Sequence, residues 1–138
     1  MTTFPNAIEL DQFIARPPGA VWRALTTPDG LAAWWAPGDV AAIVGHRYVM
    51  EMPGWGGVQC EVIEVDEPSR FVHTLGDWTI TWTLAAEGDG TRVLMVHSGF
   101  DPDRPQDRFA FDNMGPGWRD HVLPALAAAV EATPADLP

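Results

Sequence analysis

The sequence predicts an α+β fold in which a curved antiparallel sheet wraps around one long C-terminal helix. A strand and two short helices come first, the middle of the chain alternates apolar and polar residues between turn-forming residues, and the end carries apolar residues at helical spacing. A sheet with one apolar face must be covered, and only the last segment is long enough to cover it. We therefore expect the sheet to curve around that helix.

Length, charge and cysteine content narrow the class of protein. The chain has 138 residues, and we interpret residues 1–138 as a single domain. Eight basic residues, none of them lysine, stand against 19 acidic ones, so the net charge is −11. Nucleic acids and anionic membranes attract basic patches, and the sequence predicts neither as a partner. The single cysteine, the absence of a secretory pattern at the start and the absence of a long apolar run indicate a cytoplasmic protein.

The first part of the chain predicts one strand and two short helices. The strand runs from Ile8 to Arg16 and ends at Pro17-Pro18, which favours a helix start. The first helix carries Val21, Trp22 and Leu25. A second short helix follows over residues 31–35 and ends before a Pro-Gly pair.

The middle of the chain predicts a meander of short strands. In the stretch 77–100, large residues occupy every second position from Trp78 to Leu84, with threonines between them, so one face is buried. A Glu-Gly-Asp-Gly turn then leads into a strand over residues 91–100. Before this hairpin, further strands are predicted over Asp39–Val44, His46–Met52, Gly57–Asp66 and Arg70–Leu75.

The segment Asp101–Gly117 is rich in Pro, Asp and Gly yet holds Phe109, Phe111 and Met114. We interpret it as a separate lid whose apolar side chains pack inward, because long connections are often binding loops. The alternative is that residues 106–114 begin the long helix early. The Gly-Pro-Gly at 115–117 favours a break, and so the lid.

The final segment, Trp118–Ala132, predicts a helix. Its apolar residues Trp118, Val122, Leu126 and Val130 recur at every fourth position and form one stripe. Pro124 is expected to kink or restart the helix, since proline lacks a backbone donor and clashes with the preceding turn.

Several motifs carry a resemblance to a known family. Residues 21–28, VWRALTTP, together with Trp34-Trp35, resemble the early helix-turn-helix of the homologues of the activator of heat-shock protein 90 ATPase, a family within the START/Bet v 1-like (SRPBCC) superfamily. Residues 64–70, 88–92, 97–100 and 117–119 resemble its later motifs in the same order, so the resemblance covers roughly residues 8–131. It implies a helix-grip fold, in which a seven-stranded sheet wraps the C-terminal helix and leaves a cavity.

The parity of the strands selects the candidate ligand-binding residues. His46, His73 and His97 share faces with apolar residues, so all three point inward, but they lie on different strands and form no metal-binding motif. The sequence predicts no metal and no cofactor. Trp55 sits at a hairpin tip, where it either rims the cavity or folds onto its own hairpin. The expected ligand-binding residues are Tyr48, Met50, Met52, Trp55, His73, Trp78, Trp82, Met95, His97, Phe109, Phe111, Trp118 and Val122.

These observations support three functional hypotheses. The first is the binding of a small, largely hydrophobic molecule between sheet and helix, since apolar and aromatic walls are typical of such pockets. The second, implied by the resemblance, is a co-chaperone that stimulates the ATPase of heat-shock protein 90, with a homodimer as a further possible assembly. The third is a cyclase or hydrolase that uses His73 or His97, by analogy with enzymes of the same fold. Catalytic residues stay unassigned, and a binding protein is favoured over an enzyme.

Overall fold

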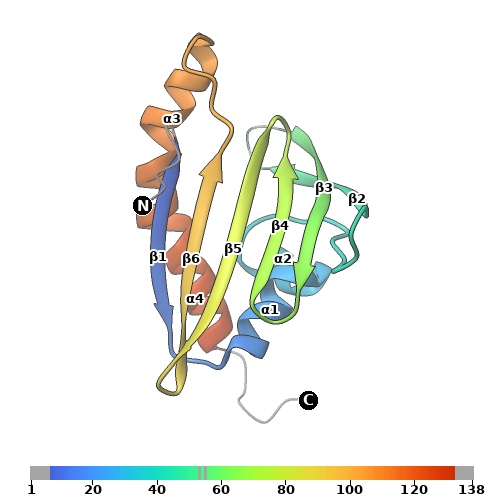
Figure 1. Ribbon diagram of the computed structural model, residues 1–138, viewed down its shortest axis with the longest axis vertical. Helices are drawn as coiled ribbons and strands as arrows, with labels where there is room; N and C mark the ends of the chain where they lie inside the picture. The colour runs from blue at the N-terminus through green and yellow to red at the C-terminus, as the bar shows by residue number, and fades with distance from the viewer. Residues whose placement is uncertain (1–6, 53, 55, 133–138) are drawn as a thin grey trace.

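A six-stranded antiparallel sheet forms one layer of the molecule, and the helices pack on one of its faces (Figure 1). The computed structural model describes residues 7–52, 54 and 56–132. The strand order is β1-β6-β5-β4-β3-β2, so every neighbour except β1–β6 is also a neighbour in sequence. The strands are β1 (Ile8–Ile14), β2 (Arg47–Met52), β3 (Gly56–Asp66), β4 (Arg70–Leu75), β5 (Trp78–Glu87) and β6 (Gly90–Ser98).

The inner face of the sheet is built around Trp82. This residue lies opposite Phe71 on β4 and Met95 on β6, and all three side chains are at most 1% exposed. Two-residue turns set this register: Gly76 and Gly88 adopt positive φ angles of 61° and 58°, a conformation that glycine reaches without steric cost. The alternation in the sequence from Trp78 to Leu84 is therefore the alternation between core and outer face.

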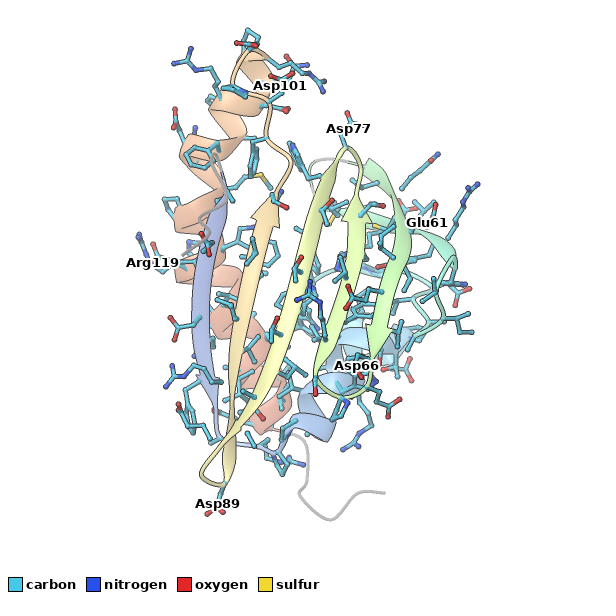
Figure 2. The ribbon with its side chains drawn as sticks, in the orientation of Figure 1. Glu61, Asp66, Asp77, Asp89, Asp101 and Arg119 are labelled. Atoms are coloured by element: carbon cyan, nitrogen blue, oxygen red, sulfur yellow. The ribbon has the colours of Figure 1, made fainter. Side chains whose placement is uncertain are left out.

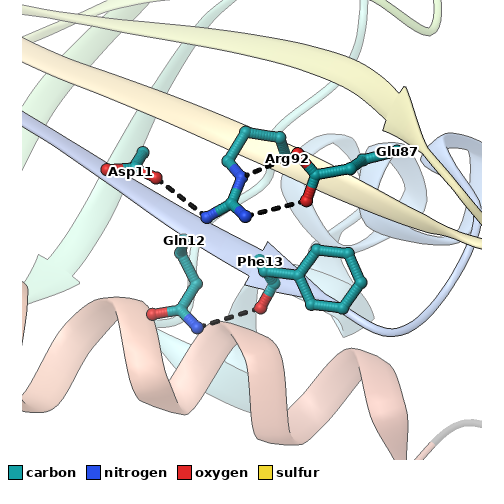
Figure 3. Close-up of polar contacts among 5 residues, drawn as sticks. All are labelled: Asp11, Gln12, Phe13, Glu87 and Arg92. Carbon is teal, nitrogen blue, oxygen red and sulfur yellow. Dashed lines mark hydrogen bonds and ion pairs between the residues drawn. The ribbon is translucent and has the colours of Figure 1, made fainter.

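The outer face of the sheet carries ion pairs beside exposed apolar side chains such as Phe13, Val49 and Leu94. Arg92 on β6 donates to Asp11 on β1 at 2.9 Å and to Glu87 at 2.7 Å, and its guanidinium also lies 5.5 Å from the centre of the Phe13 ring (Figure 3). These groups are well exposed, so the pairs add little to stability.

Both predicted N-terminal helices form, but the second begins at Pro28 and not at residue 31, and it ends at Trp34, one residue before its predicted end. Helix α1 (Pro18–Thr26) starts at a proline, and helix α2 (Pro28–Trp34) follows after the single residue Thr27. The Thr27 hydroxyl accepts a hydrogen bond from the Gly30 backbone N–H at 3.1 Å, which caps α2. No helix among the residues that the structure describes is long and apolar enough to cross a membrane.

The predicted strand Asp39–Val44 is wrong, so the described part of the chain forms a sheet of six strands and not seven. The backbone of this segment bonds locally: Ile43 N–H donates to Ala41, and His46 N–H donates to Ile43. Ile43 and Val44 are more than 60% exposed, and only Val40 is anchored in the core. The run of apolar residues here has no alternation, so no single face could have been buried.

The lid interpretation of Asp101–Gly117 is also wrong. Helix α3 (Pro105–Gly117), a π-helical turn η1 (Trp118–Val122) and helix α4 (Leu123–Glu131) form one uninterrupted helical segment. Pro116 fits because Gly115 has no Cβ to clash with the proline ring. Pro124 fits because the wider π turn, closed by the Leu123 N–H to Trp118 carbonyl bond, precedes it. Phe109 is 70% exposed instead of packing inward.

Candidate functional site

An apolar pocket opens between the C-terminal helical segment and the ends of two strands. It has a volume of about 340 Å³. Helix α3 and the π turn form one wall, Met52 and Leu75 end strands β2 and β4 on the other side, and Trp35 follows helix α2. The lining side chains, apart from one asparagine, are apolar or glycine: Trp35, Met52, Leu75, Phe109, Ala110, Asn113, Met114, Gly117, Trp118 and Val122.

Trp35 is a wall residue that the sequence interpretation missed. Its ring stacks on Trp34 at 5.2 Å and lies 5.1 Å from Trp118, the centroids being compared in both cases. Helical spacing places Trp35 away from the buried face of Trp34. The helix, however, ends at Trp34, and Trp35 has φ −124° and ψ −79°, which is not helical. The Pro-Gly pair that follows was the available signal that helical periodicity stops here.

The structure brings together only part of the predicted ligand-binding set. Met52, Phe109, Trp118 and Val122 line the pocket. Trp78 and Phe111 are partly buried outside its lining, and Trp55 lies outside the described residues. The remaining six are buried in the core and do not line the pocket: Tyr48, Met50, His73, Trp82, Met95 and His97.

Two tryptophan–histidine pairs lie directly behind the pocket. The Trp82 indole N–H donates to His73 Nε2 at 3.1 Å, and the Trp118 indole N–H donates to His97 Nδ1 at 3.0 Å. His73 Nδ1 lies 3.0 Å from the Thr74 carbonyl and must donate to it. The two neutral imidazoles therefore carry their protons on opposite nitrogens, Nδ1 in His73 and Nε2 in His97. Trp118 belongs both to the pocket wall and to this buried network.

Burial holds both imidazoles in the neutral form. It lowers the pKa of His73 to about 4, partly offset by the bond to the Thr74 carbonyl. Burial, with a smaller contribution from the neighbouring His73, lowers the pKa of His97 to about 3. Burial also raises the pKa of the Tyr48 hydroxyl. At neutral pH these groups act as neutral hydrogen-bonding parts of the core.

The arrangement offers binding surface more than reactive groups. Both nitrogens of His73 are used inside the protein, and neither His73 nor His97 lines the pocket. No group of three or more His, Cys, Asp or Glu side chains that could hold a metal ion occurs among the described residues. A larger hollow of about 420 Å³ lies beside strands β2, β3 and β4, but it is lined in part by Arg47, Gln59 and Glu61 and resembles ordinary polar surface.

Comparison with known proteins places the chain in a family. Its sequence matches the family described as "Activator of Hsp90 ATPase homolog 1-like protein" over residues 15–131. A Bacillus halodurans protein of known solution structure is 30% identical, with a TM-score of 0.80, over 95% of this chain and 100% of that chain. A Mesorhizobium loti protein is 29% identical, with a TM-score of 0.76, over 91% of this chain and 93% of that one.

A more distant structure agrees in fold. The Aha1 dimer from Colwellia psychrerythraea is 22% identical, with a TM-score of 0.77, over 91% of this chain and 96% of that chain. No curated protein matches the sequence. The helix-grip fold that the resemblance implies is confirmed by these structures, and the family match spans most of the 138 residues. The chain belongs to the family of Activator of Hsp90 ATPase homolog 1-like proteins.

Proposed function

We propose that this protein binds a small, largely apolar molecule in the pocket between α3, η1 and the ends of β2 and β4. The pocket itself supports this most: about 340 Å³ of space with an apolar lining is within the size range of small-molecule sites. Of the predicted contacts, Met52, Phe109, Trp118 and Val122 are retained in the proposal, and Trp35 is added. His73 and His97 accept hydrogen bonds from the Trp82 and Trp118 indoles and do not line the pocket, so a cyclase or hydrolase that uses these histidines is not favoured.

The exposure of Phe109 adds a second argument. A ring that is 70% exposed on an otherwise polar helix face leaves apolar surface in water. Phe111, two residues further on, contacts Phe100 with ring centroids 5.5 Å apart and faces the protein. Phe109 instead borders the pocket, where a bound apolar molecule would cover it.

Filling the pocket from Gly117 tests the proposal. Gly117 lines the pocket, and a Cβ added there meets nothing within 4 Å. The variant Gly117→Leu should bind the neutral fluorescent probe N-phenyl-1-naphthylamine at least about tenfold more weakly than the parent protein, a loss of about 1.4 kcal/mol. Its unfolding free energy should rise by about 1 kcal/mol, because leucine replaces glycine inside a helix. Fluorescence titration and urea unfolding measure the two effects.

The control adds the same side chain to the same helix away from the pocket. Gln106 is exposed in the first turn of α3, and Gln106→Leu should bind the probe as the parent does. Because the Gly117 variant is expected to be more stable, a loss of binding could not come from unfolding. Absence of probe binding to the parent protein, or equal binding by both variants, would contradict the proposal.

Stimulation of an Hsp90 ATPase is the second candidate function, favoured by the family to which the chain belongs. The acidic chain, with a net charge of −11, would meet basic surface on such a partner. Adding excess protein to the host's Hsp90 should then raise its ATP hydrolysis rate, more at low than at high salt. An unchanged rate would end this candidate.

A second copy of the chain is a further proposed partner. If the chain forms a homodimer, sedimentation equilibrium should give the mass of two chains.

A further inference from the structure

The walls of the pocket contain three aromatic rings that come from three different parts of the chain. Trp35 follows α2, Phe109 lies on α3 and Trp118 begins the π turn. The Trp35 and Trp118 rings are 5.1 Å apart and inclined at 61°, so they form two differently oriented surfaces. Clusters of rings at several orientations are the arrangement that proteins use to hold organic cations by cation–π contacts.

Among the residues that the structure describes, the lining contains no charged side chain, and Asn113 is its one polar side chain. The Asn113 amide nitrogen is 2.7 Å from the Phe109 carbonyl and donates to it. An anionic ligand would therefore enter an apolar site without a cationic partner in the lining, which is costly. Aromatic faces, by contrast, carry negative charge density and can replace part of the hydration of a cation.

The electrostatics of the whole molecule point the same way. The net charge is −11, and Asp101 lies at the end of the molecule from which α3 descends (Figure 2). Two arginines of the C-terminal part form ion pairs that cancel their own charge and that of their partners: Arg104 lies 3.4 Å from Asp77, and Arg119 lies 3.0 Å from Asp120. Such a charge distribution concentrates cations and repels anions near the site.

Arg108 is the basic residue that opposes this field. It precedes Phe109 and takes part in none of the ion pairs found among the described residues. Arg108 and Asp112 line a separate hollow on the same helix and not the pocket, so each acts on the pocket only through its charge. The charge of Arg108 should weaken the binding of a cation, whereas that of Asp112, four residues later, should strengthen it. Neutralising Arg108 and neutralising Asp112 should therefore change the affinity for a cation in opposite directions.

We propose that the pocket selects an organic cation, an apolar molecule with an ammonium or quaternary ammonium group held by Trp35, Phe109 and Trp118. This inference rests on the proposed binding function and names the chemical class of its ligand. It differs from the proposed function alone, which a neutral hydrocarbon would satisfy equally well.

A matched pair of probes separates the two ideas. Benzyltrimethylammonium and neopentylbenzene have the same shape and differ by a positively charged nitrogen in place of a carbon. Each is used to displace N-phenyl-1-naphthylamine from the parent protein at low salt, with phenylacetate as the anionic comparison. The cation should bind about tenfold more tightly than the neutral isostere, which corresponds to a desolvated cation–π contact, and phenylacetate should bind most weakly.

Variants then test whether the preference for a cation comes from the aromatic rings or from the charges near the pocket. Phe109→Leu keeps an apolar side chain at an exposed position, so it should fold normally and lower the affinity for the cation about threefold more than the affinity for neopentylbenzene. Phe13→Leu, on the outer face of the sheet, is its control and should change neither. Arg108→Gln should raise, and Asp112→Asn should lower, the affinity for the cation by roughly twofold at low salt, with both effects lost at high salt.

The outcomes are distinct. If the fluorescent probe binds and the cation and its neutral isostere displace it equally, the cation inference is wrong and the binding function stands. If the cation is preferred but Phe109→Leu and Phe13→Leu behave alike, the preference comes from net charge and the ring assignment is wrong. If no probe binds, both proposals fall together.

Discussion

Replacing Trp82 by alanine should lower the free energy of unfolding by about 4–5 kcal/mol. Trp82 is 1% exposed and contacts the rings of Trp34, Trp35 and Trp118. The substitution leaves a large cavity and also removes the N–H that donates to His73 Nε2, so a buried acceptor loses its partner. Since whole domains are stable by only about 5–15 kcal/mol, the variant should be near the limit of folding. Urea unfolding followed by circular dichroism measures the difference.

Trp78 supplies the matched control on the same strand and the same face. It is partly exposed at the end of β5 and makes fewer ring contacts, so Trp78→Ala should cost less than half as much. Equal losses for the two variants would show that the network around Trp82 adds nothing beyond the area of an indole.

Acidification should destabilise the protein before most carboxylates titrate. His73 and His97 have folded-state pKa values of about 4 and about 3, both below the ordinary value near 6.5. As the pH falls through 6.5, the unfolded chain binds protons that the folded chain does not, so stability present above that pH is lost. Between pH 8 and pH 5 each histidine should remove about 2 kcal/mol, and the pair about 4 kcal/mol.

His97→Gln isolates one half of this effect. Glutamine keeps an oxygen that can accept from the Trp118 indole but does not titrate, so the loss between pH 8 and pH 5 should shrink by about 2 kcal/mol. The control is Gln106→Leu, because Gln106 is exposed on α3 and does not titrate, so its replacement should leave the pH dependence unchanged. An identical pH profile for parent and His97→Gln would rule out a neutral buried His97. Urea unfolding at the two pH values provides the data.

Most of the sheet was predictable because apolar and polar residues alternate along its strands, and this pattern is visible in one sequence. Gly76 and Gly88 lie in the two turns that set the register of β5. Along β5, Trp78, Ile80, Trp82 and Leu84 all face inward, as their spacing requires. The segment Asp39–Val44 misled because it is apolar without alternation, and composition alone favoured a strand. Whether such a segment finds a pairing partner depends on the rest of the sheet: Glu51 of β2 donates its backbone N–H to the carbonyl of Pro37, before the segment begins.

The candidate site was less predictable because its residues come from places where local patterns end. Trp35 lies just past a helix, and Met52 and Leu75 are the last residues of their strands. Strand parity correctly places His73 and His97 inward, but it cannot distinguish a core residue from one that lines a cavity. For the segment Asp101–Gly117, its prolines and glycines favoured a lid over an early start of the long helix. The structure has the helix, because Pro105 lies in its first turn and Pro116 follows a glycine.

The π turn divides the C-terminal helix into two angular phases. Ala110, Met114 and Trp118 follow one another at intervals of four, then the next deeply buried residue is Leu123, an interval of five. One residue advances a helix by about 100°, so the extra residue resets which side chains face the sheet. Val122 continues the row of Ala110, Met114 and Trp118 along the pocket wall, and Leu123 becomes the next residue that is buried in the core. The pocket thus lies at the seam between the two phases.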